Sequence, residues 1–407
     1  MLTRPIKFDN PAGDTLAALL DLPLNRKPRA FALFAHCFTC SKNYRYVRHI
    51  SRALCGNGIA VFRFDFTGLG ESEGEFADTS FSSNVDDLVG AAEYLSAMYR
   101  APEILIGHSW GGAAVIQAAS RIPSSVAVAT IGAPSDPGHV ARHLEAAADT
   151  IADKGEAEVV LAGRSFRIKK QFLDDLESTR MQQTIRNLNR ALLVCHSPVD
   201  EVVSIENAQE IFVSARHPKS FVSLDRADHL LSEEADSCYV GDVVAAWAGR
   251  YIGVGTESPP GEDQPEVVVR TGRERYRTEI AAGVHTLVSD EPVSLGGGDR
   301  GPTPYQYLLS ALGACTGITL RMYADRHKWP VDEIVVRLAH KNVHAADCED
   351  CDTNEGKIDH IGQTIELGGA LDAEQRTRLR EIADRCPVRR TLHSKVVVKT
   401  QLSDDEA

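Results

Sequence analysis

Ser109 lies in the sequence Gly107-His108-Ser109-Trp110-Gly111, a Gly-x-Ser-x-Gly pattern. An apolar, β-rich run precedes it and a helical stretch follows, so the serine falls where a strand would turn into a helix. Glycines around such a turn let it become tight enough to lift a hydroxyl above the edge of a sheet. A serine held there attacks acyl carbons when a base removes its proton. The spacing predicts a nucleophile at Ser109; the alternative is a structural serine in a glycine turn.

A base and an acid follow in the order that this chemistry uses on a strand–turn–helix scaffold, which is serine, acid, histidine. Asp200 comes after the apolar run 191–198, and His229 comes after the run 220–224. The acid would fix the tautomer of the histidine, and the histidine would take the proton from the serine. Asp225 and Asp228 are rival acids, but they share the loop of the histidine. His108 adjoins the serine, and we expect its side chain to turn into the fold.

Residues 1–252 resemble an α/β-hydrolase of the serine esterase and peptidase type. The segment FDFTGLGES (64–72) is similar to the Asp-x-x-Gly-x-Gly-x-Ser loop that such enzymes carry. In these relatives the loop that begins here with His36 supplies half of the oxyanion hole. The resemblance implies that the backbone N–H groups of Phe38 and Trp110 hold the developing oxyanion. One such donor lowers the barrier by about 3 kcal/mol.

Cys37 and Cys40 form a Cys-x-x-Cys pair inside this same turn. That spacing could hold a metal or cycle a disulfide. Backbone geometry matters more than sulfur at an oxyanion turn, so we expect packing or turn-shaping thiols. A redox switch and a metal site are the alternatives. A stable Cys37–Cys40 bond would reshape the turn that presents Phe38, and the sequence therefore predicts that the pair is not a disulfide in the working enzyme.

A second pair of cysteines lies near the carboxy terminus. Cys315 is inside the apolar helix 301–324, and Cys386 ends another helix directly before Pro387. These motifs resemble the OsmC/Ohr superfamily of thiol proteins. The resemblance implies that Cys315 attacks an organic hydroperoxide to give a sulfenic acid, which Cys386 resolves as a disulfide that a dithiol reductant reopens. It also implies an intertwined homodimer formed through this domain.

One departure from that family concerns the activation of the thiol. Peroxidases of the family carry a glutamate ten residues before the first cysteine, where this chain has Tyr305 followed by Gln306. An unassisted thiol, with a pKa of about 8.5, is only slightly ionised at neutral pH. The activating arginine of the family has four candidates here, namely Arg270, Arg273, Arg275 and Arg277. Peroxide reduction, another thiol or binding role, and a structural dimerisation module all remain open.

His340, His344, Cys348 and Cys351 form a set of ligand types that could bind zinc. Their spacing fits no common zinc finger, and acidic residues surround the two thiols. Those charges disfavour thiolates but would favour a cation. We expect a solvated acidic loop without metal.

The elements that must position these residues fall into two domains. Residues 1–252 alternate β-rich runs with amphipathic helices, which predicts a mostly parallel sheet covered on both faces, hence the α/β class. Residues 135–190 break the rhythm with a helix, a hairpin around Ala162-Gly163 and another helix, and are expected to form a lid. Residues 253–266 are a Gly- and Pro-rich linker.

Residues 267–407 form the second, OsmC-like α+β domain. The expected order is three short strands, a long helix from about Pro304 to Lys328, two strands, a helix and a last strand. These strands are expected at 267–272, 275–280, 285–289, 333–340, 359–367 and 395–402, and the second helix at 372–386.

Composition limits the partners. The net charge of −13 in 407 residues argues against nucleic acid and anionic membranes. No apolar run approaches the roughly 20 residues of a membrane span. The amino terminus shows no secretory signal, and nine cysteines in a chain of this kind suggest reduced thiols, so we expect a cytoplasmic protein.

The first hypothesis is therefore a serine hydrolase of carboxylic esters, with small-molecule ester or acyl substrates and no cofactor, fused to an OsmC-like thiol domain. A rival hypothesis is a thiol peroxidase with a degenerate hydrolase domain. A third is a non-catalytic protein in which the OsmC-like part binds ligands or dimerises.

Overall fold

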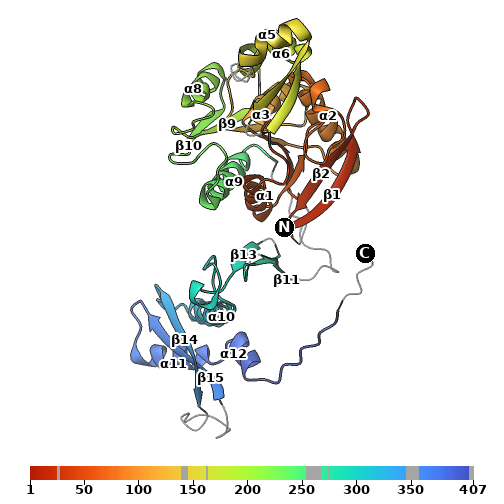
Figure 1. Cartoon of the computed structure of the whole chain (residues 1–407). Helices are drawn as coiled ribbons and strands as arrows, with labels where there is room; N and C mark the ends of the chain where they lie inside the picture. Colours follow the sequence, from red (N-terminus) through yellow and green to blue (C-terminus); the bar gives the residue numbers. More distant parts are fainter. Residues whose placement is uncertain are drawn as a thin grey trace. The chain divides into compact units, whose positions relative to one another are not determined.

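The computed structural model describes residues 1–24, 28–138, 145–161, 164–253, 267–273, 275–283, 285–344 and 357–402. The described chain divides into two compact units, residues 1–268 with 281–286, and residues 269–280 with 287–407 (Figure 1). The predicted linker lies almost entirely outside the described residues, so the domain boundaries stay a prediction.

The first unit is built on an eight-stranded sheet in the order β1-β2-β4-β3-β5-β6-β9-β10. From β4 to β10 neighbouring strands are parallel, and β1 and β2 add an antiparallel edge that the sequence analysis did not predict. The mostly parallel α/β sheet is confirmed. Its strands are β1 (Leu2–Asp9), β2 (Thr15–Leu22), β3 (Ala30–Ala35), β4 (Ile59–Phe64), β5 (Ile104–His108), β6 (Ala127–Ile131), β9 (Ala191–His196) and β10 (Lys219–Ser223).

Helices cover both faces of this sheet, as expected for buried parallel strands. On one face α1 (Arg45–Gly56) and α9 (Glu234–Ala248) pack side by side over Ala32 and Phe34 (Figure 1). On the other, α2 (Phe81–Met98) and α3 (Trp110–Ala118) pack over Leu33 and Ala35. Successive residues of β3 thus enter opposite cores. The remaining elements of this region are α8 (Ile205–Ser214), η1 (Phe76–Asp78) and η2 (Ala119–Arg121).

The segment between β6 and β9 has the predicted helix, hairpin and helix. Its elements are α5 (Glu145–Lys154), β7 (Glu156–Leu161), β8 (Arg164–Lys169), α6 (Lys170–Ser178) and α7 (Met181–Arg186). β7 pairs with β8 in a separate two-stranded sheet. Phe166, Phe172 and Leu176 are buried in the same core cluster as Phe38 and Trp110. The insertion therefore packs over the end of the sheet that carries Ser109; whether it acts as a lid stays a prediction.

After residue 266 the chain forms a small three-stranded sheet, β11 (Val267–Thr271), β12 (Thr278–Ala282) and β13 (His285–Ser289), followed by η3 (Val293–Leu295). The long helix α10 (Pro304–His327) begins with a capping box between Thr303 and Gln306, and the antiparallel pair β14 (Ile334–His344) and β15 (Lys357–Leu367) follows it. α11 (Ala373–Ala383) and α12 (Pro387–Leu392) complete the unit. Leu320, Leu379 and Ile382 lie at the centre of its small core.

The predicted last strand, 395–402, is wrong for the single chain. These residues form neither helix nor strand, and Val396, Val397 and Val398 are exposed. Their β-branched side chains favour extended backbone, but a strand forms only where a sheet edge accepts its hydrogen bonds. Within the described part of the chain no such edge pairs with them.

None of the helices described here is long and apolar enough to span a bilayer.

Candidate functional site

Ser109 occupies the turn between β5 and α3 with a φ of 53°, a left-handed conformation that is rare for residues other than glycine. Its N–H donates to the carbonyl of Ile131, at the end of the neighbouring strand β6. A Cβ on Gly107 would lie 2.2 Å from the carbonyl oxygen of Gly111, and one on Gly111 would lie 2.3 Å from that of Ala35. The flanking glycines are thus required by backbone packed against backbone. Strain of about 1–3 kcal/mol at such a residue is typical of functional turns.

Asp200 and His229 meet at the same end of the sheet. His229 Nδ1 lies 2.7 Å from Asp200 Oδ2. Burial alone would raise the pKa of Asp200, but the hydrogen bond from His229 and the N–H groups of Val202 and Val203 outweigh it, so the pKa lies below its usual range. Asp200 is therefore an ionised acceptor that fixes the proton of His229 on Nδ1 and leaves Nε2 as a base.

The two rival acids are engaged elsewhere. Asp225 accepts a hydrogen bond from the Ser223 hydroxyl, and Asp228 accepts two from Ser232. The ring of His229 instead packs against His108, the residue before Ser109, with 4.9 Å between the ring centroids. The structure thus brings His229 beside the serine turn and Asp200 beside His229.

Gly132 is a contributor that the sequence analysis missed. It follows β6 with a φ of 53°, and a Cβ there would lie 3.2 Å from Asp200 Oδ2 and 3.4 Å from His229 Nδ1. A side chain would crowd the ion pair. The glycine after a parallel strand was visible in the sequence, but its neighbours were not.

Two backbone N–H groups are available near the serine. Trp110 is the first residue of α3, so its N–H has no partner within the helix. Phe38 lies in the turn after β3, and its ring packs edge-on against Trp110 at 5.0 Å between centroids. The insertion covers Phe38 from the other side through Phe166 and Phe172. The side chains of Phe38 and Trp110 are thus buried among aromatic rings, and hydrogen bonds to a developing charge are stronger in such surroundings than in water.

The Cys37–Cys40 pair differs from expectation, because a disulfide joins the two sulfur atoms. Both residues are buried. The bond closes the turn around Phe38, and the prediction of free thiols is therefore wrong. The prediction failed because the Cα atoms of the two residues, 5.2 Å apart, lie at a distance that favours bonding.

A buried charge network anchors the end of this turn. Lys42 is 1% exposed, and its Nζ lies 2.6 Å from Asp65 Oδ2, while its own N–H donates to Asp65 Oδ1. Glu71 adds a second carboxylate at 2.5 Å from Nζ. Arg63 donates to the carbonyl of Lys42 and pairs with the buried Asp21. Asp65 begins the Asp-x-x-Gly-x-Gly-x-Ser loop, so this motif anchors the turn that follows β3 through Lys42.

Cys315 and Cys386 also meet, on α10 and at the start of α12. Burial raises the pKa of Cys315, and so does the hydrogen bond that it donates to Cys386. Burial would raise the pKa of Cys386 too, but the hydrogen bonds from Cys315 and the N–H of Arg389 hold it below its usual range. Cys315 is partly exposed and Cys386 is buried. Cys315 is therefore the hydrogen-bond donor of the pair, and the pKa of its thiol lies above that of Cys386.

The two residues at the position of the missing glutamate, Tyr305 and Gln306, are engaged in other contacts. Tyr305 stacks on the ring of His340 with 4.5 Å between centroids, and Gln306 is used in the capping box of α10. Among the candidate arginines, Arg270 pairs with Glu279 at 3.8 Å and Arg275 donates to the carbonyl of Gly297. Which of Arg270, Arg273, Arg275 and Arg277 would act on Cys315 stays open.

The zinc alternative falls mostly outside the described residues. Cys348 and Cys351 are not described, nor is the side chain of His344. His340 bonds to Asp359 at 2.8 Å. Among the residues that are described, no cluster of His, Cys, Asp and Glu could hold a metal ion.

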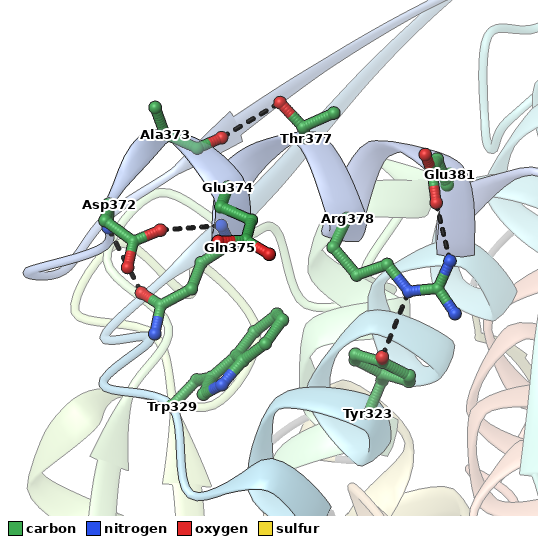
Figure 2. Close-up of a pocket in the computed structure, with 9 residues that line it drawn as sticks. All are labelled: Tyr323, Trp329, Asp372, Ala373, Glu374, Gln375, Thr377, Arg378 and Glu381. Atoms are coloured by element: carbon green, nitrogen blue, oxygen red, sulfur yellow. Dashed lines mark hydrogen bonds and ion pairs between the residues drawn. The ribbon is translucent and has the colours of Figure 1, made fainter.

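A cavity of about 730 Å³ opens elsewhere on the second unit, between the end of α10 and the start of α11 (Figure 2). Tyr323 and Trp329 lie beneath the helix, and Arg378 reaches across to donate to the Tyr323 hydroxyl and to Glu381. The other lining residues are Asp372, Ala373, Glu374, Gln375 and Thr377. None of the predicted site residues lines it.

Comparison with known proteins gives two family matches. Residues 32–336 match the model of the alpha/beta hydrolase family, and residues 296–401 match that of OsmC-like proteins. The esterase domain of a Rhodothermus marinus protein, a solved structure, is 52% identical, with a TM-score of 0.52 over 62% of this chain and 100% of its own.

Mouse palmitoyl-protein thioesterase ABHD10, a mitochondrial protein, is 27% identical over 199 residues, which are 46% of this chain and 66% of that protein. The chain thus spans slightly less than two thirds of this relative's length. The solved structure of mouse alpha/beta hydrolase domain-containing protein 10 is 20% identical with a TM-score of 0.50, over 61% of this chain and 99% of its own, and it shows the shared fold.

Proposed function

The chain belongs to the alpha/beta hydrolase family and carries an OsmC-like domain, and on that premise we propose that its first unit is a serine hydrolase of carboxylic esters. The observation that carries the proposal is the pairing of His229 with Asp200 beside the strained turn of Ser109. The named activity of the Rhodothermus marinus relative, an esterase domain, supports the same reaction.

In the proposed reaction Ser109 attacks the acyl carbon while His229 takes its proton. The N–H groups of Phe38 and Trp110 hold the oxyanion, and Asp200 stabilises the imidazolium that forms. His229 then returns the proton to the leaving alcohol. Water attacks the acyl-enzyme by the reverse route and releases the acid. No metal or organic cofactor enters these steps.

Acyl thioesters are a second candidate substrate, because the mouse relative is named a palmitoyl-protein thioesterase. The same machinery serves both, since a thiolate is a better leaving group than an alkoxide. Hydrolysis of matched oxygen and sulfur esters of one acyl chain measures the preference. Turnover of either that persists in Ser109→Ala would contradict the proposal, and Cys315→Ser is the matched control that should retain it.

For the second unit we propose weak reduction of organic hydroperoxides. Cys315 attacks the peroxide, taking one oxygen as a sulfenic acid and releasing an alcohol. Cys386 then displaces water to give the disulfide, which an external dithiol reduces. The contact between the two sulfurs supports this order, and the raised pKa of Cys315 makes the first step slow. A thiol count and a peptide map after one equivalent of alkyl hydroperoxide test this peroxidase reaction. If Cys315 stays reduced, the second unit is not a peroxidase and has a binding or assembly role.

We also propose a homodimer through the second unit. α10 has 24 residues, of which four are buried, and Ile318 and Met322 are at least 60% exposed. These side chains and the valines of residues 396–398 are exposed apolar groups, which a second copy would cover. Light scattering should give twice the chain mass, and Met322→Glu should lower it towards the monomer. A wild-type monomer would contradict this proposal.

A further inference from the structure

His108 ends β5, directly before Ser109, and its side chain is completely buried. Its Nε2 lies 2.6 Å from the carbonyl oxygen of His229. A carbonyl only accepts hydrogen bonds, so Nε2 must carry the proton. Nδ1 is buried and has no hydrogen-bond partner among the described residues. Among the described residues the side chain of His108 therefore makes one hydrogen bond, and that bond is to the main chain of the proposed catalytic base.

The loop that holds His229 needs such an anchor. It lies between β10 and α9 and contains two residues other than glycine in left-handed conformation, Asp225 with a φ of 33° and Leu231 with a φ of 49°. Each costs of order 1 kcal/mol or more, so the loop keeps this shape only if its contacts determine it. The ring of His229 is held by Asp200, and its backbone by His108.

We propose that His108 is a positioning residue, which fixes the backbone of His229 at a set distance from the Ser109 hydroxyl. The inference rests on the proposed serine hydrolase. Because His108 and Ser109 are covalent neighbours, a hydrogen bond from one places the base relative to the other. Tyr46 packs on the far part of the same ring, at 4.6 Å between centroids, and holds the donor in place.

A histidine suits this role because it can donate without a charge. Burial and the nearby His229 lower the pKa of His108 to about 3, so its ring stays neutral during turnover. A cation at this place would oppose the positive charge that His229 gains when it takes the serine proton. Lysine or arginine would supply the hydrogen bond but also that charge.

A second buried histidine, two strands away in the sheet, makes the same kind of hydrogen bond to a loop carbonyl. His196 ends β9 and is completely buried, and its Nε2 lies 2.8 Å from the carbonyl oxygen of Val203. In the part of the chain that the structure describes, its Nδ1 has no hydrogen-bond partner. Val203 donates its N–H to Asp200, so this second histidine anchors the turn that carries the acid. A neutral histidine at a strand end thus holds each of the two loops that face Ser109.

The test compares three variants by steady-state hydrolysis of a p-nitrophenyl ester, with active sites counted by a fluorophosphonate. His108→Leu removes the donor and should lower kcat per active site about 100-fold, the effect of a displacement near 1 Å, with KM little changed. His108→Gln offers an amide N–H near the position of Nε2 and should restore most of that loss. Leu105→Ala, a core truncation on the same strand, should lower the melting temperature but not kcat per active site.

His108 does not position the base if kcat per active site is the same in His108→Leu as in the wild type. The same conclusion follows if kcat falls as far in His108→Gln as in His108→Leu. His108→Asn, whose amide is too short to reach, replaces the leucine variant if that does not fold, and the same comparison applies. A wild-type protein that neither hydrolyses the ester nor takes up the fluorophosphonate would overturn the proposed function itself, which is a distinguishable outcome.

Discussion

Replacing Asp65 by Asn should impair both the stability and the rate of the hydrolase unit. The substitution keeps the shape of the side chain and removes its charge. Asp65 is fully buried, and its carboxylate accepts hydrogen bonds from both the Nζ and the backbone N–H of Lys42. In the variant Lys42 keeps Glu71, a carboxylate that is 68% exposed and therefore well screened.

Breaking a buried ion pair by removing one partner lowers the free energy of unfolding by about 3–5 kcal/mol. Because Lys42 keeps its contact with Glu71, we expect a loss of about 3 kcal/mol, the lower end of that range. The second effect acts through the turn, because Lys42 follows Phe38 by four residues and its N–H loses a charged acceptor. Loss of an oxyanion donor costs about 100- to 1,000-fold in kcat. We expect a fall of about 100-fold, since the donor is displaced rather than removed.

Urea unfolding and ester hydrolysis, measured on the same preparations, test both numbers. Lys42→Met combined with Asp65→Asn removes both charges and should regain much of the stability that the single change loses. Asp86→Asn breaks an exposed ion pair with Arg121 and is the matched control, with a cost below about 1 kcal/mol. The reasoning is refuted if Asp65→Asn behaves like this control, or if the double variant is no more stable than the single one.

Three further predictions follow from the two cysteine pairs and the acid. Cys37→Ser with Cys40→Ser removes the bond that closes the turn of Phe38, but the buried Lys42–Asp65 pair still anchors that turn, so most ester hydrolysis should remain. Activity that responds to a dithiol in the wild type but not in this variant would indicate a redox switch instead. Asp200→Asn should lower kcat about 10⁴-fold, and a loss below tenfold in steady-state assays would mean that another group orients the histidine. Because the pKa of Cys315 is raised, its alkylation by iodoacetamide should be slow at neutral pH and should become faster as the pH rises past 8.5. Cys386→Ala removes the acceptor of its hydrogen bond and should accelerate this alkylation at pH 8. Equal alkylation rates in both proteins would contradict the effect of that hydrogen bond.

The candidate triad could be predicted because each member follows its own strand, and parallel strands bring their carboxyl ends to one edge of a sheet. Local patterns were enough to find Ser109, Asp200 and His229. The turn of His108 into the fold was also anticipated from its place beside the serine, and its burial agrees with that. Its hydrogen bond to the loop of His229, 121 residues away, has no trace in the sequence.

The features that were missed depend on distant partners. Lysine is ordinarily a surface residue, and Lys42 is buried because Asp65, 23 residues later, arrives beside it. The valines at 396–398 have strand propensity but no edge to pair with in one chain. The edge strands β1 and β2 were overlooked because TLAALLDL, an almost wholly apolar run, does not alternate as a half-buried strand does.

The most direct test of the central claim is the site of covalent labelling by a fluorophosphonate. The full-length protein should take up one label per chain, and peptide mapping should locate it on Ser109. Ser109→Ala should take up none, while Cys315→Ser should be labelled at the wild-type rate. A wild-type chain that stays unlabelled, or that carries the label on another residue, would contradict the serine hydrolase account.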